Sequence, residues 1–152
     1  MLYSIGTVAK KTGLTSYTLR YYEKEGLTPF VKRDEQGRRV FDDDDLDSLA
    51  LIRCLKQTGM PLEEIRQFVT WCDEGDGTLA DRLALFQQQR VVVEAQIHDL
   101  LKNLQKVNHK IDIYSQACVS GHEADVDCDL IPKRSAAELL AQVEQYEAEH
   151  EL

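Results

Sequence analysis

The spacing of apolar and polar positions predicts that the chain begins with two short helices. Residues 4–13 place apolar side chains on one face, between a serine suited to an N-cap and a glycine suited to a helix stop. A second helix starts at Thr15 or Ser16 and ends before Gly26. Two short helices joined by a tight turn that contains glycine form a helix-turn-helix.

A hairpin and two further helices complete this N-terminal region. Residues 30–33 and 38–41 hold β-branched or aromatic side chains and are separated by a turn ending in glycine, which is typical of a hairpin. Acidic residues open a helix over 43–58, where the macrodipole stabilises each carboxylate by roughly 0.3–1 kcal/mol. A proline opens the next helix, over 61–72, and the polar, glycine-containing segment 73–77 marks the best boundary in the chain.

The strongest periodic pattern is a 3.5-residue repeat between residues 79 and 114. A helix of about 40 residues extends about 60 Å, too far to be covered by so small a domain, and a sustained repeat predicts a coiled coil. The alternative, one arm of an intramolecular helical hairpin, needs a second long apolar helix, and the tail offers only a short one near 135–149. Apolar side chains occupy every position of the repeat except Arg90: Leu79, Leu83, Phe86, Val93, Ile97, Leu100, Leu104, Val107, Ile111 and Tyr114.

The charge distribution separates the two ends of the chain. The net charge of −9 argues at first against nucleic acid, but residues 1–41 hold eight basic and four acidic side chains, a balance of +4. Residues 42–152 therefore carry 10 basic against 23 acidic side chains, or −13. A basic module on an acidic body is typical of a protein that docks one end on phosphate. No apolar stretch approaches the roughly 18 residues of a membrane span, so we expect a cytoplasmic protein with no membrane partner.

A specific motif links these elements to a known family. Residues 20–27 contain Arg-Tyr-Tyr-Glu followed by Gly-Leu, and they closely resemble the MerR family of bacterial transcription regulators. Residues 37–41 stand where that family has its wing, although Arg38 occupies a position where the family more often has an aromatic residue. Residues 58–65 also match, and the resemblance runs from Ile5 to about Tyr114.

The resemblance implies a mostly α fold in three parts. These are a winged helix-turn-helix DNA-binding module over 1–74, a dimerisation helix over 75–117 that forms an antiparallel coiled coil, and a tail over 118–152 with an effector-loop candidate and a short helix. The expected partners are a second copy of the chain, double-stranded promoter DNA of near-palindromic sequence, and RNA polymerase. By resemblance, the dimer activates by distorting the promoter so that polymerase can engage it. No catalytic constellation is visible, so we expect no enzyme.

The DNA surface is predicted on the second helix and the wing. That helix would lie in the major groove, and arginines of the wing would hold the backbone on either side. An inward-facing Tyr22 has core packing as its alternative role. The predicted DNA-binding residues are Thr15, Ser16, Tyr17, Arg20, Tyr21, Tyr22, Arg33, Arg38 and Arg39.

Cys54 is the first candidate for the sensor. The segment around it resembles the aldehyde- and electrophile-responsive branch of the family, in which one cysteine on this helix is the reactive thiol. Arg53 and Lys56 flank Cys54 and would favour its thiolate if they lie near it. The alternative is a small buried hydrophobe, because Cys54 shares a face with Leu46 and Ala50.

Cys118 and Cys128 are the second candidate. They bracket a loop similar to the metal-binding loop of the copper- and zinc-sensing branch, although the nine residues between them exceed the usual copper-sensor spacing. Two thiolates select soft ions such as Cu(I), and His122 would add a ligand for Zn. The alternative for these two cysteines is an acidic tail in which the thiols have no function. For the protein as a whole, the alternative to a transcription regulator is a dimeric metal-buffering or scaffold protein. We favour Cys54, which lies between the DNA module and the dimer helix, and expect no certain cofactor.

Overall fold

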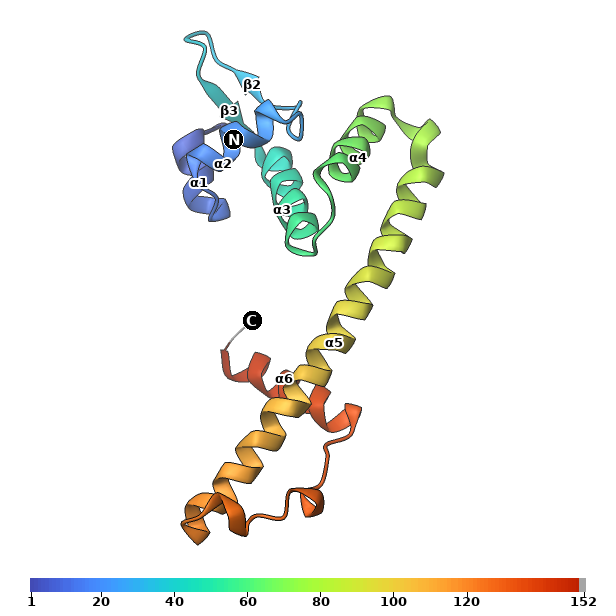
Figure 1. Ribbon diagram of the computed structural model, residues 1–152. Helices are drawn as coiled ribbons and strands as arrows, with labels where there is room; N and C mark the ends of the chain where they lie inside the picture. The colour runs from blue at the N-terminus through green and yellow to red at the C-terminus, as the bar shows by residue number, and fades with distance from the viewer. Residues whose placement is uncertain (151–152) are drawn as a thin grey trace. The chain divides into compact units, whose positions relative to one another are not determined.

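The computed structural model describes residues 1–150, which form two compact units joined within one long helix. The first unit covers residues 1–91 and the second begins at residue 92. Figure 1 shows the helical character of both units and the small sheet of the first. Within the described residues, no helix is both long and apolar enough to cross a membrane.

The helix-turn-helix forms as the pattern predicts. Helix α1 covers Ile5–Thr12 and helix α2 covers Ser16–Lys24. Each begins at a hydroxyl side chain, because Ser4 Oγ accepts a hydrogen bond from the Thr7 amide and Thr15 Oγ1 accepts one from the Thr18 amide, at 3.3 and 3.0 Å. Gly13 ends α1 with a φ of 69°, in the left-handed region that favours glycine.

A three-stranded antiparallel sheet forms the wing and ties it to the N-terminus. Strand β3 (Arg39–Phe41) lies between β1 (Tyr3–Ser4) and β2 (Lys32–Arg33). Tyr3 pairs with Phe41, and Lys32 pairs with Val40. The hairpin of β2 and β3 matches the prediction, whereas β1 was not predicted, because two residues are too few to show a strand period.

Two longer helices complete the first unit. Helix α3 covers Asp43–Gln57 and opens with a capping box, in which Asp42 and Asp45 each accept a hydrogen bond from the other's amide. Helix α4 covers Leu62–Glu74, and the short 3₁₀ helix η1 covers Asp76–Thr78. The core consists of Val8, Leu19, Tyr22, Leu27, Phe41, Leu49, Ile52, Leu55, Met60 and Ile65, each at most 5% exposed.

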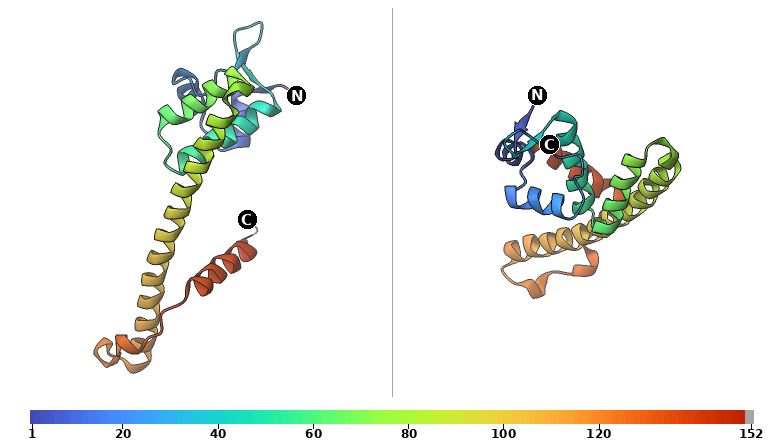
Figure 2. Two further views of the ribbon diagram at one scale, coloured as in Figure 1. Left: turned by 90° about the vertical axis from the view of Figure 1, so that its right-hand side faces the viewer. Right: turned by 90° about the horizontal axis from the view of Figure 1, so that it is seen from above.

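Helix α5 covers Leu79–Ser120, 42 residues, and continues six residues past the end of the predicted repeat (Figures 1 and 2). Its first turns belong to the first unit. The Phe86 ring packs edge-on against Phe68, with centroids 5.1 Å apart, and Gln89 Nε2 donates to Thr58 Oγ1 at 2.7 Å. The compact unit therefore extends past the polar break at 73–77, because the start of the long helix packs back onto α3 and α4.

In the second unit, helix α6 (Ala136–His150) packs against α5. The short 3₁₀ helices η2 (Glu123–Asp125) and η3 (Cys128–Leu130) lie in the connection. Asn108 and Gln142 exchange side-chain hydrogen bonds of 2.8 and 3.4 Å, and the Arg134 guanidinium binds Asp112 at 2.9 Å. Ile113, Ile131 and Leu139 are buried. The tail helix is therefore a short intramolecular partner for α5.

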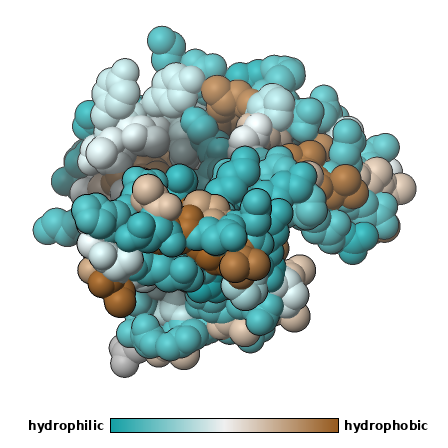
Figure 3. Space-filling view, turned by 60° about the horizontal axis from the view of Figure 1, so that its bottom comes forward, coloured by the Kyte–Doolittle hydropathy of each residue, from teal (hydrophilic) through white to brown (hydrophobic). Residues whose placement is uncertain are grey.

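The apolar side chains of the 3.5-residue repeat, which form the predicted coiled-coil seam, remain largely exposed beside α6. Asn108, which binds α6, and Asp112, which binds Arg134 just before α6, each stand one position after a seam residue and therefore on the adjacent stripe of the helix. Figure 3 shows apolar patches (brown) set in a mainly hydrophilic surface (teal). The exposed seam side chains in this unit are Ile97, Leu100, Val107, Ile111 and Tyr114, between 48% and 66% exposed.

Candidate functional site

The outer face of α2 presents side chains free to contact a ligand. Tyr17 is 78% exposed, and Arg20 is exposed and makes no hydrogen bond or ion pair to any residue of the described range 1–150. Thr15 is occupied as the N-cap, and Ser16, the first helical residue, is half-buried. A helix with an exposed tyrosine and a free arginine near its N-terminal end is suited to contact base edges and phosphates.

The two tyrosines that follow Arg20 lie deeper. Tyr21 is half-buried against the core, and its ring has the Lys56 ammonium 5.9 Å from its centroid. Tyr22 is only 3% exposed and belongs to the core, so packing is the role that the structure gives this ring. Burial is also the main reason why the pKa of Tyr22 is raised. Of the nine predicted DNA-binding side chains, Tyr22 is the one that the fold withdraws from the surface.

Glu23 joins the wing to α2. Its carboxylate binds Arg33 of β2 at 3.0 Å and also accepts a hydrogen bond from Arg39 Nε of β3. Burial by itself would raise the pKa of Glu23, but the two guanidinium groups outweigh it and lower the pKa. Arg39 is 24% exposed, so it acts mainly as a clamp that orients the hairpin on α2. The sequence prediction had assigned both arginines to the DNA backbone.

Arg38 stands at the tip of the wing. Its side chain is 74% exposed and its Nε donates to Asp34 at 2.8 Å, across the turn that Gly37 closes with a φ of 76°. Hydrogen bonds from Arg38, first from its backbone amide, lower the pKa of Asp34. Arg38 thus remains available to a phosphate at the outer edge of the wing.

Sequence reasoning missed Glu23, although it belongs to the Arg-Tyr-Tyr-Glu motif. Its partners stand 10 and 16 residues further along the chain, so no local spacing reveals the pairing. Lys24, exposed in the last turn of α2, was also left out of the predicted surface. Its position at the end of a predicted recognition helix was the signal that would have found it.

Cys54 lies on α3 with its side chain exposed, which removes the alternative of a buried hydrophobe within this chain. It borders a hollow of about 540 Å³ between α1 and α3, shared with Lys11, Ala50 and Arg53. Arg53 also donates to the Thr12 carbonyl at the end of α1. Lys56 instead lies over the rings of Tyr21 and Tyr22, so only one of the two predicted flanking cations borders the thiol's hollow.

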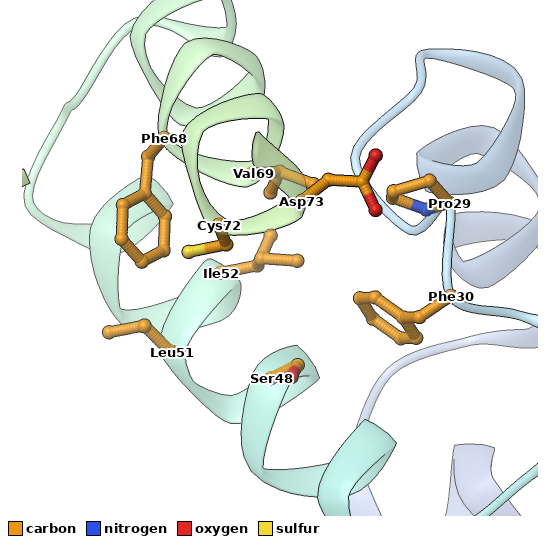
Figure 4. A pocket seen from close by; sticks show the side chains of 9 residues that line it. All are labelled: Pro29, Phe30, Ser48, Leu51, Ile52, Phe68, Val69, Cys72 and Asp73. Atoms are coloured by element: carbon orange, nitrogen blue, oxygen red, sulfur yellow. The ribbon is translucent and has the colours of Figure 1, made fainter. Parts of the chain in front are cut away.

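Cys72 occupies a second pocket, of about 350 Å³, drawn in Figure 4. The picture shows its thiol on α4 beside Ile52 of α3, while the Asp73 carboxylate points toward Pro29. Arg82 Nη1 lies 4.0 Å from the Cys72 sulfur. Cys72 is therefore a second exposed thiol near a cation, in a mainly apolar pocket.

Cys118 and Cys128 lie in the second unit, at the end of α5 and in η3, and both are exposed. The Cys128 thiol donates only to the Val126 carbonyl, at 3.9 Å. Across residues 1–150, no group of three or more His, Cys, Asp or Glu side chains is gathered as a metal site would require.

Comparison with known proteins agrees with this geometry. The model of the MerR HTH family regulatory proteins matches residues 3–70, and the MerR DNA-binding model matches residues 46–109. An uncharacterised HTH-type transcriptional regulator of Haemophilus influenzae is 42% identical over 135 residues, covering 89% of this chain and all of that protein. The regulator AdhR of Bacillus subtilis is 39% identical over 87 residues, 57% of this chain and 62% of its own.

Among solved structures, HiNmlR, described as a MerR family regulator lacking the sensor domain and bound to promoter DNA, superposes with a TM-score of 0.77. It shares 43% identity and is covered completely, against 83% of this chain. Regulators of this kind are transcription factors and not enzymes. The exposed face of α2, the wing clamped to it and these matches lead to one conclusion: the chain belongs to the MerR family of DNA-binding transcription regulators.

Proposed function

We propose that this regulator binds a near-palindromic promoter as a homodimer and activates transcription when an aldehyde or similar electrophile reacts with Cys54. The observation that carries the effector proposal is the exposed Cys54 thiol in a hollow bordered by cationic side chains of α1 and α3. Membership in a DNA-binding family also removes the metal-buffering or scaffold alternative.

The open seam of α5 supports the homodimer. Leaving five large apolar side chains of one helix about half exposed is unfavourable in water, since burial stabilises by roughly 25 cal/mol per Å² of apolar surface. A second copy of α5, running antiparallel, supplies a surface of the same 3.5-residue repeat. Two DNA-binding units related by a two-fold axis then match an operator with two-fold symmetry.

The dimer distorts the promoter because its two DNA-binding units hold both half-sites of the operator at once. A dimer that bends or untwists the promoter between its half-sites spends roughly 1–6 kcal/mol on DNA deformation. A change of similar size within the protein is enough to shift that balance, and RNA polymerase then engages the realigned promoter.

The chemistry at Cys54 is an addition. The sulfur attacks the aldehyde carbon, a C–S bond forms, and the carbonyl oxygen takes up the proton lost by the thiol, which gives a hemithioacetal. The adduct occupies the hollow beside Arg53, whose hydrogen bond to Thr12 ties α3 to the end of α1. Displacing this contact repositions the helix-turn-helix, with a coupling of about 1–3 kcal/mol typical of allosteric switches.

In vitro transcription with formaldehyde tests the assignment. We expect Cys54→Ser to lose induction while keeping operator binding. Cys72→Ser is the matched control, since it removes another exposed thiol of the same unit. The double variant Cys118→Ser/Cys128→Ser should stay inducible. If instead the double variant loses induction and Cys54→Ser keeps it, the terminal thiols carry the signal. Induction by Cu(I) or Zn that is lost in the double variant would support the soft-metal alternative.

A further inference from the structure

A hollow of about 660 Å³ lies between α5 and α6, in the second unit. This volume is within the range of about 300–1,000 Å³ typical of small-molecule sites. Leu101 of α5 and Ala136 and Leu139 of α6 supply its apolar lining. Since no thiol lines it, this hollow has no part in the chemistry at Cys54.

The hollow gathers nearly all the positive charge of its unit. Residues 92–152 contain five basic side chains against twelve acidic ones. Four of the five, Lys102, Lys106, Lys110 and Lys133, line the hollow, and no carboxylate does. Lys110 lies 5.7 Å from the Tyr114 ring centroid, and the other three make no ion pair with any residue from 1 to 150. Cations assembled in an otherwise acidic unit favour an anionic ligand.

Two buried polar atoms in the same lining lack a partner. His109 Nδ1 and Gln105 Oε1 are inaccessible to solvent and make no hydrogen bond within the described part of the chain. A buried polar group without a partner costs about 1–3 kcal/mol and calls for a bound water, ion or ligand. His109 Nδ1 carries a proton in one tautomer, and rotation of the Gln105 amide presents its NH₂ group instead of the oxygen. Both side chains line the hollow, and a change of rotamer that turns these groups to its surface lets each donate to an anion there.

We propose that this hollow binds a small amphipathic carboxylate, such as a medium-chain fatty acid. Its carboxylate is held by the ammonium groups of Lys102, Lys106 and Lys133 with hydrogen bonds from His109, and its apolar body covers the lining of Leu101, Ala136 and Leu139. The apolar lining favours such a ligand over inorganic phosphate or the backbone of DNA, which offer charge without an apolar body. This site would give the regulator a second ligand, independent of its thiols.

Methyl NMR on the full-length protein, free of DNA, tests the proposal with decanoate as the probe. Decanol is the matched ligand, with the same chain and no charge, and inorganic phosphate supplies charge alone. We expect decanoate to shift the methyl signals of Leu101, Ala136 and Leu139, and decanol to bind at least about fivefold more weakly. Equal binding of decanoate and decanol, shifts confined to other methyl groups, or the same shifts with phosphate would each overturn the proposal.

Variants sharpen the test. Lys102→Gln/Lys106→Gln should weaken decanoate binding about fivefold or more and leave decanol unchanged, whereas Lys24→Gln, an exposed lysine of the other unit, should change neither. Ala136→Phe should block both ligands by filling the hollow. Unchanged decanoate affinity in the double lysine variant would remove the lysines from the site. Since the experiment uses neither operator nor electrophile, its failure leaves the proposed function standing.

Discussion

The two units differ in how completely one chain buries its apolar residues. Residues 1–91 enclose ten buried hydrophobic side chains in a single core. From residue 92 onward, Ile113, Ile131 and Leu139 are buried while Ile97, Leu100, Val107, Ile111 and Tyr114 remain about half exposed. The contrast teaches that the core of the first unit closes within one chain. The repeat of α5, which begins in the first unit with Leu79 and Leu83 at 56% and 60% exposed, presents an apolar surface for another molecule to cover.

Breaking the seam is the strongest test of this contrast. Ile97→Asp with Leu104→Asp places four carboxylates in the dimer interface, at a cost of more than about 5 kcal/mol per dimer. Sedimentation velocity should then show monomers, with operator binding lost. Val119→Asp, at a side chain that is 91% exposed beyond the repeat, should stay dimeric. A double variant that remains dimeric would refute the coiled-coil assignment.

Damaging the core of the first unit should lower stability without removing the seam. Leu49 is fully buried, so Leu49→Ala should reduce the free energy of unfolding by about 2–5 kcal/mol in urea titrations. Leu140→Ala, at a side chain that is 46% exposed on α6, should change it by less than about 0.5 kcal/mol. Similar losses in both variants would contradict the difference in burial between the units.

The predicted DNA-binding residues include side chains that are exposed and free, such as Arg20, and side chains that hold the wing on α2, such as Arg39. We expect Arg20→Ala to weaken operator binding by about 1–3 kcal/mol, the typical cost of losing one base contact, since this guanidinium is exposed and unpaired within residues 1–150. Arg39→Ala should cost less and mainly lower the salt dependence, because Glu23 already holds this side chain. Fluorescence anisotropy at several salt concentrations checks both. Wild-type binding by a variant lacking Arg20, Arg38 and Arg39 would place the DNA surface elsewhere.

The smallest expected effect concerns the clamp between wing and helix. Arg39 and Arg33 lower the pKa of Glu23, so their contribution to folding is present above the ordinary glutamate pKa and is lost as the pH falls through the lowered value. Glu23→Gln should therefore reduce the free energy of unfolding by about 1 kcal/mol or less at pH 7. The difference from wild type should shrink toward pH 3. A difference that does not depend on pH would assign the loss to packing instead of charge.

Much of the first unit was readable from local pattern. Ser4 and Thr15 cap the two helices of the helix-turn-helix, and the acidic run before α3 became a capping box, since all these devices act within a few residues. Strand β1 was not readable, because two residues acquire strand geometry only by pairing with Phe41 and Val40 far along the chain. The same reason hid the ion pairs of Glu23 with Arg33 and Arg39.

The candidate DNA-binding and thiol sites were also predicted only in part from the sequence. Sequence and resemblance identified Arg20 and Tyr17 as DNA-facing and Cys54 as a candidate thiol, and the structure leaves all three side chains exposed. Tyr22 was predicted on the same surface but lies in the core, because it stands three residues after the buried Leu19 and so shares the inward face of α2. Sequence alone did not show that Cys72 lies beside Arg82, a contact that depends on how α5 returns along α4.

The sequence by itself determined the order and type of the helices, the 3.5-residue seam and the family, because caps, periodicity and motif are properties of neighbouring positions. Only the tertiary structure decided which charged groups are occupied and which are free. Pairing of the wing arginines with Glu23 joins positions 10 and 16 residues apart, and the hollow brings Lys133 together with Lys102, Lys106 and Lys110, which stand 23 to 31 residues before it. Such contacts depend on how helices and strands pack in space, and no local pattern of residues encodes that packing directly.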